Sequence, residues 1–546
     1  MNHDGGVLRN KVIAKLTRGQ HRQSDHLPAA RISRIVEARE KDMADVTVFD
    51  LDAGALYEAV LTRDRRFDGQ MFVAVSSTRI YCRPICTVRP PQFKNCTFYK
   101  TAAAAEAQGY RPCLRCRPEL APGSSAPVDA VPRLAALAIR RIEDGALSRL
   151  SLDELAAEFD VTARHLRRAI RQEVGLSPVE LAQTQRLLLA KQLLTDTKMS
   201  VTEAAFAAGF ESLRRFNAAF KDRYRLTPTS LRRSVGTNKS DSKDVYRFNL
   251  AVRPPFDLAP LLAFWGARST AGVEQVIDGW YRRIVVVGHY QGWIAVGPGR
   301  KDHTVQVLVS TDLGPVLSQV LSRLKAMLDV RARPDAIAEH LSKDPLLASH
   351  LRQWPGLRVP GAFDGFECGI RTILGQQVSV RAATTIAGRL ASQFGWPCET
   401  PYDSLTTAFP APEILAAASI IELKALGLTT RRAETIKGFA NAVASGHIRL
   451  EPGVDPDRIR SAMLALPGIG SWTAEYLLMR AVGWPDAFPA NDLGLIKASG
   501  LSSAALRIRA ESWRPWRSYA AALLWQSLSD SSNPTAGCLN LKTLSD

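Results

Sequence analysis

The sequence predicts a multidomain, mainly α-helical chain with four folded parts. These are a small α/β domain, an all-α domain with an internal repeat, an α+β domain and an all-α domain. Its 546 residues suffice for roughly three to five domains. Two short stretches, 121–128 and 236–245, have the small and polar composition of linkers. Between these stretches, helical and strand-like periods occur in separate blocks, which favours distinct domains.

The linker-like stretches and the changes of period divide the chain into five segments. Residues 1–46 are polar and without a clear period, so we expect a flexible tail there. The apolar runs at 71–75, 283–288 and 305–309 predict buried strands. The expected segments are a tail over 1–46, an α/β domain over 47–121, a helical domain over 129–235, a β-rich domain over 246–332 and a helical domain over 333–530.

Composition and charge narrow the function classes. Hydrophobic residues make up 46% of the chain and charged residues 23%, which excludes global disorder. The formal net charge of +18 indicates a polyanionic partner, most often nucleic acid. No apolar run reaches the roughly 18 residues that span a bilayer. The N-terminus lacks the apolar core of a signal peptide, so we expect a cytoplasmic protein without a membrane partner.

The positive charge is concentrated in the first half of the chain. Residues 61–120 carry 11 basic and 4 acidic side chains, and residues 131–240 carry 19 and 12. The last 306 residues carry 32 basic and 27 acidic side chains. A solvated basic surface without a partner is the plain alternative, but both basic blocks coincide with the motifs described next.

Five of the eight cysteines lie within 35 residues of one another. Cys82 and Cys86 form a C-x3-C pair, 26 residues follow, and Cys113 and Cys116 form a C-x2-C pair. Two such pairs across one loop can supply four sulfurs to a tetrahedral Zn²⁺ ion. Unrelated buried cysteines are the alternative. Cys96 stands outside both pairs, and we expect it to serve ordinary packing.

This region resembles the N-terminal domain of the Ada family. The resemblance rests on the stretches Phe72-Val-Ala-Val75, Tyr81-Cys-Arg-Pro-Ile-Cys86 and Gly109-Tyr-Arg-Pro-Cys-Leu-Arg-Cys-Arg-Pro118. It implies that one Zn²⁺-bound cysteine, Cys82, accepts a methyl group irreversibly from methylphosphotriesters in DNA. Methylation removes one negative charge at the interface, so it should tighten DNA binding, with flanking arginines such as Arg83 and Arg89 offsetting the remaining repulsion.

Residues 151–228 contain a near-repeat of a helix, a turn and a second helix. Ser151-Leu-Asp-Glu154 and Ser200-Val-Thr-Glu203 have the pattern of capping boxes. The second helices are expected over 162–173 and 211–223. Their basic positions, among them Arg168 and Arg215, suit phosphates and base edges in double-stranded DNA. A plain helical hairpin is the alternative; the tandem copy resembles the AraC-type double helix-turn-helix domain.

The sharpest motif of the C-terminal half is Leu466-Pro-Gly-Ile-Gly470, followed by Asp492. The backbone N–H groups of such a hairpin, which includes Gly468 and Gly470, can face a DNA phosphate. Together with Asp492, residues 246–528 resemble the helix-hairpin-helix DNA glycosylases, and most closely the AlkA family of 3-methyladenine DNA glycosylases. The resemblance makes 246–330 the β domain of that family and Asp492 the catalytic aspartate.

A carboxylate suits N-glycosidic cleavage because the sugar becomes cationic as the base leaves. The resemblance also implies a pocket of aromatic residues that stacks on a flipped, alkylated purine. By position it is formed by Trp472, Tyr476, Trp525 and Phe264, for each of which core packing is the alternative. Gln377 stands where that family has an apolar residue that wedges into the DNA stack.

Taken together, the motifs predict a fusion of an Ada-like methyl acceptor and regulator with an AlkA-like glycosylase. Trp472 stands where bifunctional relatives have a Schiff-base lysine, so we expect a monofunctional enzyme without lyase activity. The resemblance to the Ada family further suggests RNA polymerase as a partner. One alternative is a zinc-dependent transcriptional regulator whose C-terminal half binds DNA without glycosylase activity. Another is that Cys82 is purely structural.

Overall fold

The computed structural model describes residues 52–122, 133–235 and 245–531. All of the described residues belong to one compact unit. The tail expected over 1–46 lies outside the described residues, as do most of the two expected linkers. None of the described helices is both long and apolar enough to cross a membrane.

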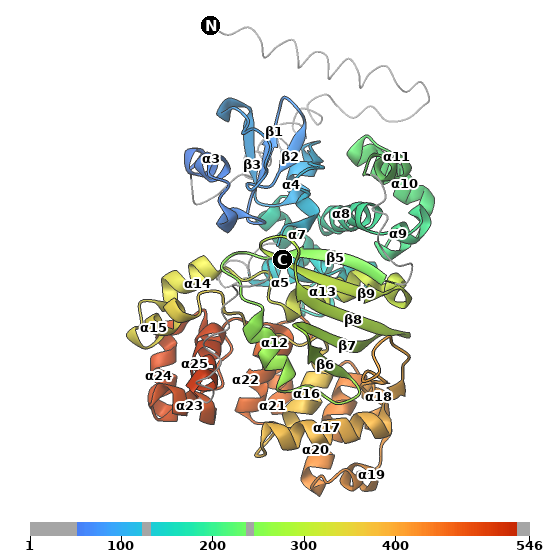
Figure 1. Ribbon diagram of the computed structural model, residues 1–546. Helices are drawn as coiled ribbons and strands as arrows, with labels where there is room; N and C mark the ends of the chain where they lie inside the picture. The colour runs from blue at the N-terminus through green and yellow to red at the C-terminus, as the bar shows by residue number, and fades with distance from the viewer. Residues whose placement is uncertain (1–51, 123–132, 236–244, 532–546) are drawn as a thin grey trace, which may run out of the picture. The chain divides into compact units, whose positions relative to one another are not determined.

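The first domain is built on a mixed four-stranded sheet with the strand order β3-β1-β2-β4 (Figure 1). The apolar run Met71–Val75 was predicted to form a buried strand. Its residues Phe72–Val75 form β1, which is largely buried, so the prediction is confirmed. Asp52 and Thr101 cap its two α-helices through their side chains. The elements are α3 (Ala53–Leu61), β1 (Phe72–Val75), β2 (Ile80–Cys82), β3 (Cys96–Tyr99), α4 (Ala102–Ala107) and β4 (Arg111–Pro112).

The described residues 133–235 form seven α-helices, in two similar units joined by the long helix α8. Both predicted capping boxes are present, at Ser151 with Glu154 and at Ser200 with Glu203. Gly175 and Arg225 end the second helix of each unit in the left-handed conformation. The helices are α5 (Arg133–Glu143), α6 (Leu152–Ala157), α7 (Ala163–Val174), α8 (Pro178–Asp196), α9 (Val201–Ala207), α10 (Leu213–Tyr224) and α11 (Pro228–Val235).

A five-stranded antiparallel sheet of order β5-β9-β8-β7-β6 forms the core of the third domain. Its strands include both predicted apolar runs, because 283–288 falls largely in β7 and 305–309 in β9. Helices α12 and α13 belong to the same hydrophobic core. The elements are β5 (Val245–Ala251), α12 (Ala259–Gly266), β6 (Glu274–Ile277), β7 (Trp280–Val287), β8 (Tyr290–Pro298), β9 (Thr304–Ser310) and α13 (Leu317–Met327).

The rest of the described chain is helical, as predicted, with two additions. Two short strands, β10 (Trp396–Pro397) and β11 (Thr407–Ala408), pair with each other. A π-helical turn, Leu478–Val482, follows α22 directly. The helices are α14 (Pro334–Leu341), α15 (Pro345–Gln353), α16 (Gly365–Leu374), α17 (Val380–Phe394), α18 (Pro412–Ala417), α19 (Ile420–Ala425), α20 (Thr430–Ala444), α21 (Pro456–Leu464), α22 (Ser471–Leu477), α23 (Leu493–Ser499), α24 (Ser503–Ala510) and α25 (Arg517–Ser531).

A buried cluster of charged side chains joins the five-stranded sheet to helix α16. Glu367 of α16 pairs with Arg283 of β7, and it lies 3.0 Å from Arg371 Nη1. Arg371 in turn donates a 2.6 Å hydrogen bond to Glu274 of β6. Burial alone would raise the pKa of Glu274, but the charges of Arg371 and Arg283 hold that pKa below its ordinary value. The cluster therefore fixes the sheet against the helices that carry the site described below.

Replacing Glu367 with Ala should lower the free energy of unfolding of the C-terminal half by about 3–5 kcal/mol, because it leaves Arg283 buried without one of its two carboxylates. All ten tryptophans lie between Trp265 and Trp525, so denaturant unfolding followed by tryptophan fluorescence reports on this half. The exposed Glu413→Ala is the control, with an expected change below about 0.5 kcal/mol. Equal stability of the two variants would contradict the structural role of the cluster.

Candidate functional site

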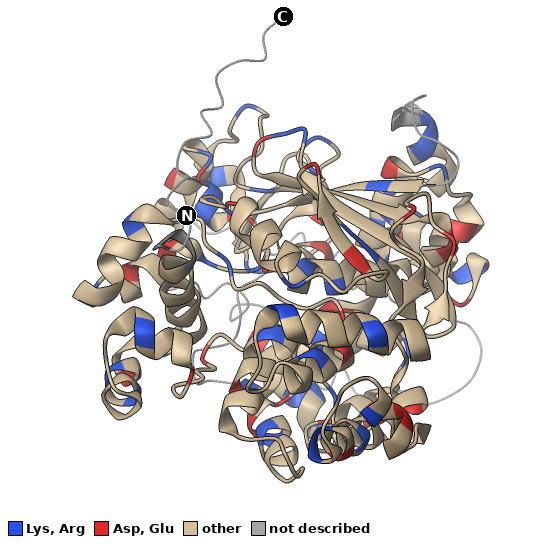
Figure 2. Cartoon of the chain, turned by 60° about the horizontal axis from the view of Figure 1, so that its bottom comes forward, with Lys and Arg blue, Asp and Glu red and all other residues tan. Residues whose placement is uncertain are grey.

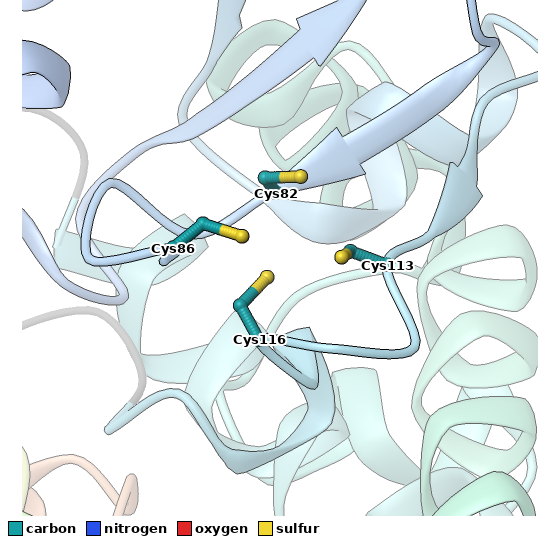
Figure 3. Close-up of side chains that lie close together, drawn as sticks. All are labelled: Cys82, Cys86, Cys113 and Cys116. Atoms are coloured by element: carbon teal, nitrogen blue, oxygen red, sulfur yellow. The ribbon is translucent and has the colours of Figure 1, made fainter. Parts of the chain in front are cut away.

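Four cysteine sulfurs point toward a common centre in the first domain (Figure 3). The Sγ atoms of Cys82, Cys86, Cys113 and Cys116 all lie within 4.8 Å of one another. Strand β2 ends at Cys82, the following loop carries Cys86, and the turn after β4 carries the other pair. β2 and β4 are parallel neighbours in the sheet, which brings the two distant pairs together. Cys96 is not part of this cluster, and its thiol donates to the Gln92 carbonyl.

The crowding of the four thiols fits a bound cation. Hydrogen bonds from Cys113, Cys116 and Cys86 raise the pKa of Cys82 far above its ordinary value. The same contacts, with Cys116 first, lower the pKa of Cys113 far below its own. Four thiols this close together cannot all lose their protons unless a cation compensates the negative charge of the resulting thiolates. A tetrahedral set of four sulfurs is the donor set of a structural Zn²⁺ site, which the sequence predicted.

Backbone N–H groups reach some of these sulfurs and not others. The Arg83 N–H lies 3.4 Å from Cys116 Sγ, and the Arg115 N–H lies 3.4 Å from Cys113 Sγ. The Val88 N–H donates to Cys86. Among the described residues, no backbone N–H is hydrogen-bonded to Cys82 Sγ. Because such bonds withdraw charge from sulfur, the four sulfurs of the cluster are not equivalent.

Arg83 does not have the role that the sequence suggested for it. Its side chain is 6% exposed and pairs with Asp68, with a 2.7 Å bond from Nε. It also donates a 3.2 Å bond to the Cys116 carbonyl. These contacts use the guanidinium to fix the loop between two of the cysteines, so Arg83 is not available to a DNA phosphate. Arg89, by contrast, is exposed.

The second site is a cavity of about 760 Å³ in the C-terminal half, with Asp492 in its wall. Both carboxylate oxygens of Asp492 accept a hydrogen bond from an indole. Trp472 Nε1 lies 2.8 Å from Oδ2, and Trp525 Nε1 lies 2.8 Å from Oδ1. The Leu495 backbone N–H adds a 2.9 Å bond to Oδ1, which caps helix α23. The carboxylate is therefore held in one orientation by three helices, α22, α23 and α25.

Aromatic side chains line the same cavity. The rings of Trp472 and Tyr476 are stacked, with centroids 5.2 Å apart, and Trp525 lies edge-on to Tyr476 at 6.0 Å. Phe264, from helix α12 of the sheet domain, also lines the cavity. The four aromatic residues that the sequence placed in one pocket thus lie together around Asp492.

Two arginines in this cavity were not identified from the sequence. The Arg268 guanidinium lies 3.8 Å from the centre of the Phe264 ring, and that of Arg480 lies 4.4 Å from it. Arg480 also donates a 2.7 Å hydrogen bond to the Tyr476 hydroxyl. Burial lowers the pKa of Arg268. The π-helical turn that carries Arg480 has no simple sequence signature, and Arg268 comes from another domain, so no local pattern connected them.

The hairpin Leu466–Gly470 lies between helices α21 and α22 as predicted. Gly468 has a φ of +86°, and a Cβ there would lie 2.0 Å from Thr435 Oγ1, so only glycine fits. Gly470 begins α22 without a side-chain cap. Gln376 Nε2 donates to the Gly468 carbonyl at 3.1 Å, which fixes the neighbouring turn against the hairpin. Gln377, at the tip of that turn, is exposed and has a φ of +57°.

The second helices of the two repeated units present basic side chains. Arg164 and Arg168 of α7 are exposed, as is Arg215 of α10. Figure 2 shows Lys and Arg distributed over many of the helices, with Asp and Glu between them. Arg223 is the last residue of the second helix expected from the sequence, but it pairs with the fully buried Glu106 of helix α4 at 2.9 Å. It connects two domains and is not an exposed position of α10.

Comparison with known protein families gives four matches along the chain. The metal binding domain of Ada matches residues 55–119, and a helix-turn-helix domain matches 155–234. The AlkA N-terminal domain matches 247–364, and the HhH-GPD superfamily of base excision DNA repair proteins matches 370–513. The four matches follow one another in the order of the domains described above.

One relative matches nearly the whole chain. The probable bifunctional transcriptional activator/DNA repair enzyme AlkA of Mycobacterium tuberculosis (strain CDC 1551 / Oshkosh) is 39% identical over 483 residues, covering 86% of this chain and 96% of the relative. The chain belongs to this family of bifunctional AlkA proteins. DNA-3-methyladenine glycosylase 2 of Escherichia coli (strain K12) is 36% identical over 280 residues, 51% of this chain and 96% of that enzyme. The bifunctional transcriptional activator/DNA repair enzyme Ada of the same strain is 33% identical over 154 residues, 28% of this chain and 42% of Ada.

The family assignment accounts for the combination of sites in one chain. In this chain, the matches to the metal binding domain of Ada and to a helix-turn-helix domain precede the matches to the AlkA N-terminal domain and to the HhH-GPD superfamily. The zinc-type cysteine cluster lies in the Ada-type part, and Asp492 lies in the HhH-GPD part. DNA is the partner common to the helix-turn-helix and base excision repair parts.

Proposed function

We propose that the chain repairs and senses DNA alkylation: it excises alkylated purines of the 3-methyladenine type, and it moves methyl groups from DNA methylphosphotriesters onto Cys82. The observation that carries the first activity is the Asp492 carboxylate, held by two indole N–H groups in the wall of an aromatic cavity. The family to which the chain belongs, named for activator and repair functions, supports the combination.

The geometry at Asp492 suits cleavage of an N-glycosidic bond. As the bond between the base nitrogen and C1′ breaks, the electron pair leaves with the base and positive charge develops on the sugar. A carboxylate already fixed beside the sugar stabilises that charge without having to reorganise. The indole donors keep the carboxylate oriented, and water then adds to C1′ and loses a proton.

The aromatic rings supply the binding site for the flipped base. An alkylated purine that has been turned out of the duplex can stack on Trp472 and Tyr476, and the electron-rich rings favour a cationic base. Methylation at N3 or N7 makes the purine cationic and a good leaving group, so no strong general acid is required. Phe264 contributes to the pocket wall together with Arg268, which packs on its ring.

DNA binding by this half is proposed to use the hairpin and the turn beside it. The backbone N–H groups of Gly470 and of the first residues of helix α22 suit a DNA phosphate, whereas the Ile469 N–H group donates to the Leu466 carbonyl within the hairpin. Gln377 projects from the turn that Gln376 ties to the hairpin, so it would fill the gap left by the flipped base. Trp472 stands where bifunctional glycosylases have the lysine that forms a Schiff base with the sugar. Without that lysine, the enzyme should leave an abasic site and not cleave the strand.

Replacing Asp492 with Asn tests the glycosylase proposal. The change removes the charge but keeps the size of the side chain, and the single-turnover release of 3-methyladenine from methylated duplex DNA should fall by about 100-fold or more. The wild-type products should be abasic sites without strand breaks. Circular dichroism and binding to undamaged duplex serve as controls for folding.

Equal release by the two proteins would refute a catalytic Asp492. No release by the wild-type chain would favour the alternative, a zinc-dependent regulator whose C-terminal half only binds DNA.

For the sensor, the proposed reaction is a direct methyl transfer. The Cys82 sulfur attacks the methyl carbon, the bond from that carbon to the phosphotriester oxygen breaks, and the electron pair stays on the oxygen of the restored phosphodiester. A bound Zn²⁺ ion supplies the charge that keeps the four sulfurs as thiolates at neutral pH. Cys82 is the acceptor because backbone N–H groups reach the other sulfurs, and exposed Arg89 lies nearby in sequence to receive the DNA backbone.

The regulatory part of the proposal concerns promoter DNA. Helices α7 and α10, with Arg168 and Arg215, would enter the major groove. Loss of one negative charge from the cysteine cluster would tighten binding, and contact with RNA polymerase would complete an activator role. We further propose a cytoplasmic location, because four thiols that bind a metal ion are typical of a reducing compartment.

Mass spectrometry after incubation with methylphosphotriester DNA tests the sensor. One methyl group should appear on Cys82, and Cys82→Ala should accept none. Cys96→Ala is the matched control and should accept methyl as the wild type does, because Cys96 lies outside the cluster. An unmodified wild-type protein that still holds one Zn²⁺ per chain would show that Cys82 is purely structural.

A further inference from the structure

A row of ion pairs joins the first helix-turn-helix unit to the glycosylase part. Arg141 of helix α5 is 4% exposed and lies between two carboxylates. One belongs to its own domain, Glu158, with bonds of 2.9 and 3.0 Å, and the other is Glu451 of the glycosylase. Arg449 of the glycosylase pairs with the same Glu158. Chain segments about 300 residues apart in the sequence therefore share one buried charge cluster.

Further pairs extend this row on both sides of Arg141. Arg458 of helix α21 lies 3.0 Å from Asp160, in the turn of the first unit, and donates a 3.0 Å bond to the Glu158 carbonyl. Arg133, at the start of α5, lies 2.7 Å from Asp457 of α21. We call these contacts the charged seam; its residues are Arg133, Arg141, Glu158, Arg449, Glu451 and Arg458.

A glycine with a positive φ allows the two chain segments to approach closely at the seam. Gly453, between Glu451 and helix α21, has a φ of +87°. A Cβ at this position would lie 3.0 Å from Arg141 Cγ and 3.1 Å from the Leu137 carbonyl. The glycosylase chain therefore approaches α5 so closely that a Cβ atom at 453 would push its neighbours aside, which a loose tether between two domains would not require.

The seam ends at the helix that leads into the hairpin. Helix α21, which carries Arg458, is followed directly by Leu466–Gly470. Arg460 of α21 donates a 2.6 Å bond to Glu475 of α22, so the helices on both sides of the hairpin are fixed to each other. On the other side of the seam, Arg164 and Arg168 of α7 remain exposed. The seam thus uses α5, α6 and the turn of the first unit and leaves the basic face of α7 free for DNA.

We propose that the first helix-turn-helix unit is a fixed DNA-binding arm of the glycosylase, held on α21 by the charged seam. The hairpin and α7 then belong to one rigid body. When one of them binds DNA, the other is already held in a fixed position, so its binding costs no further conformational entropy. A flexible linker alone would leave two DNA-binding parts that act separately. The inference rests on the proposed DNA contacts of the hairpin and α7, and it is independent of the chemistry at Asp492.

Charge reversal at Glu451 tests the seam in the full chain. Glu451→Arg sets a cation against Arg141; Arg141 keeps Glu158 as a partner, and the side chain at 451 is 37% exposed, so the new guanidinium can turn toward solvent. Glu413→Arg, at an exposed position of α18, is the matched control with the same change in net charge. Hydrogen exchange should speed up in α5 and around 449–456 in Glu451→Arg only. Arg133→Glu is a second variant from the other side and should act in the same direction.

DNA binding supplies the functional readout, measured by fluorescence anisotropy on an undamaged duplex. Glu451→Arg should raise Kd by about 3- to 10-fold relative to Glu413→Arg, although both variants gain positive charge. Arg164→Ala/Arg168→Ala should weaken the wild-type chain by about 10-fold and the Glu451→Arg chain by clearly less.

Additive effects of the two changes, or hydrogen exchange in Glu451→Arg equal to that of the control, would overturn the fixed arm. Because undamaged DNA is used, a failure of base excision would count against the proposed function alone.

Discussion

The C-terminal site depends on how one carboxylate is held. Asp492 accepts hydrogen bonds from the indoles of Trp472 and Trp525 and from the Leu495 backbone, so three helices meet at a single charged group. The same indoles form walls of the cavity. In the proposed reaction, binding of the base and stabilisation of the sugar cation would therefore be coupled, because the rings that would stack on the base also orient the carboxylate.

The surrounding structure serves to keep those helices in place. The buried pairs among Glu274, Arg283, Glu367 and Arg371 join the antiparallel sheet to α16, and the sheet domain contributes Phe264 to the cavity. On the other side, the charged seam fixes α21 against the first helix-turn-helix unit. The basic residues behind the net charge of +18 thus do more than provide a surface for DNA. Part of it, including Arg141 and Arg283, is buried and holds domains together.

The sequence predicted local features well and distant contacts poorly. The capping boxes at Ser151 and Ser200, the cysteine pairs and the hairpin each lie within a few residues, where spacing determines geometry. Arg83 was expected at DNA because it is basic and next to Cys82. Its buried pairing with Asp68 could not be read from the sequence, since no local pattern links residues on separate turns. The same limit applies to Arg268 and Arg480, and to Arg141, whose partner Glu451 lies in another domain.

The most direct test of this account measures single-turnover release of 3-methyladenine by Trp472→Phe and Trp525→Phe at saturating protein. Each variant keeps an aromatic ring but loses the N–H group that holds Asp492. Hydrogen bonds to a charged group contribute about 1.5–3 kcal/mol, so each rate should fall by about 10- to 100-fold. Binding to undamaged duplex should not change. Wild-type rates in both variants would show that the orientation of the carboxylate by the two indoles does not matter for excision.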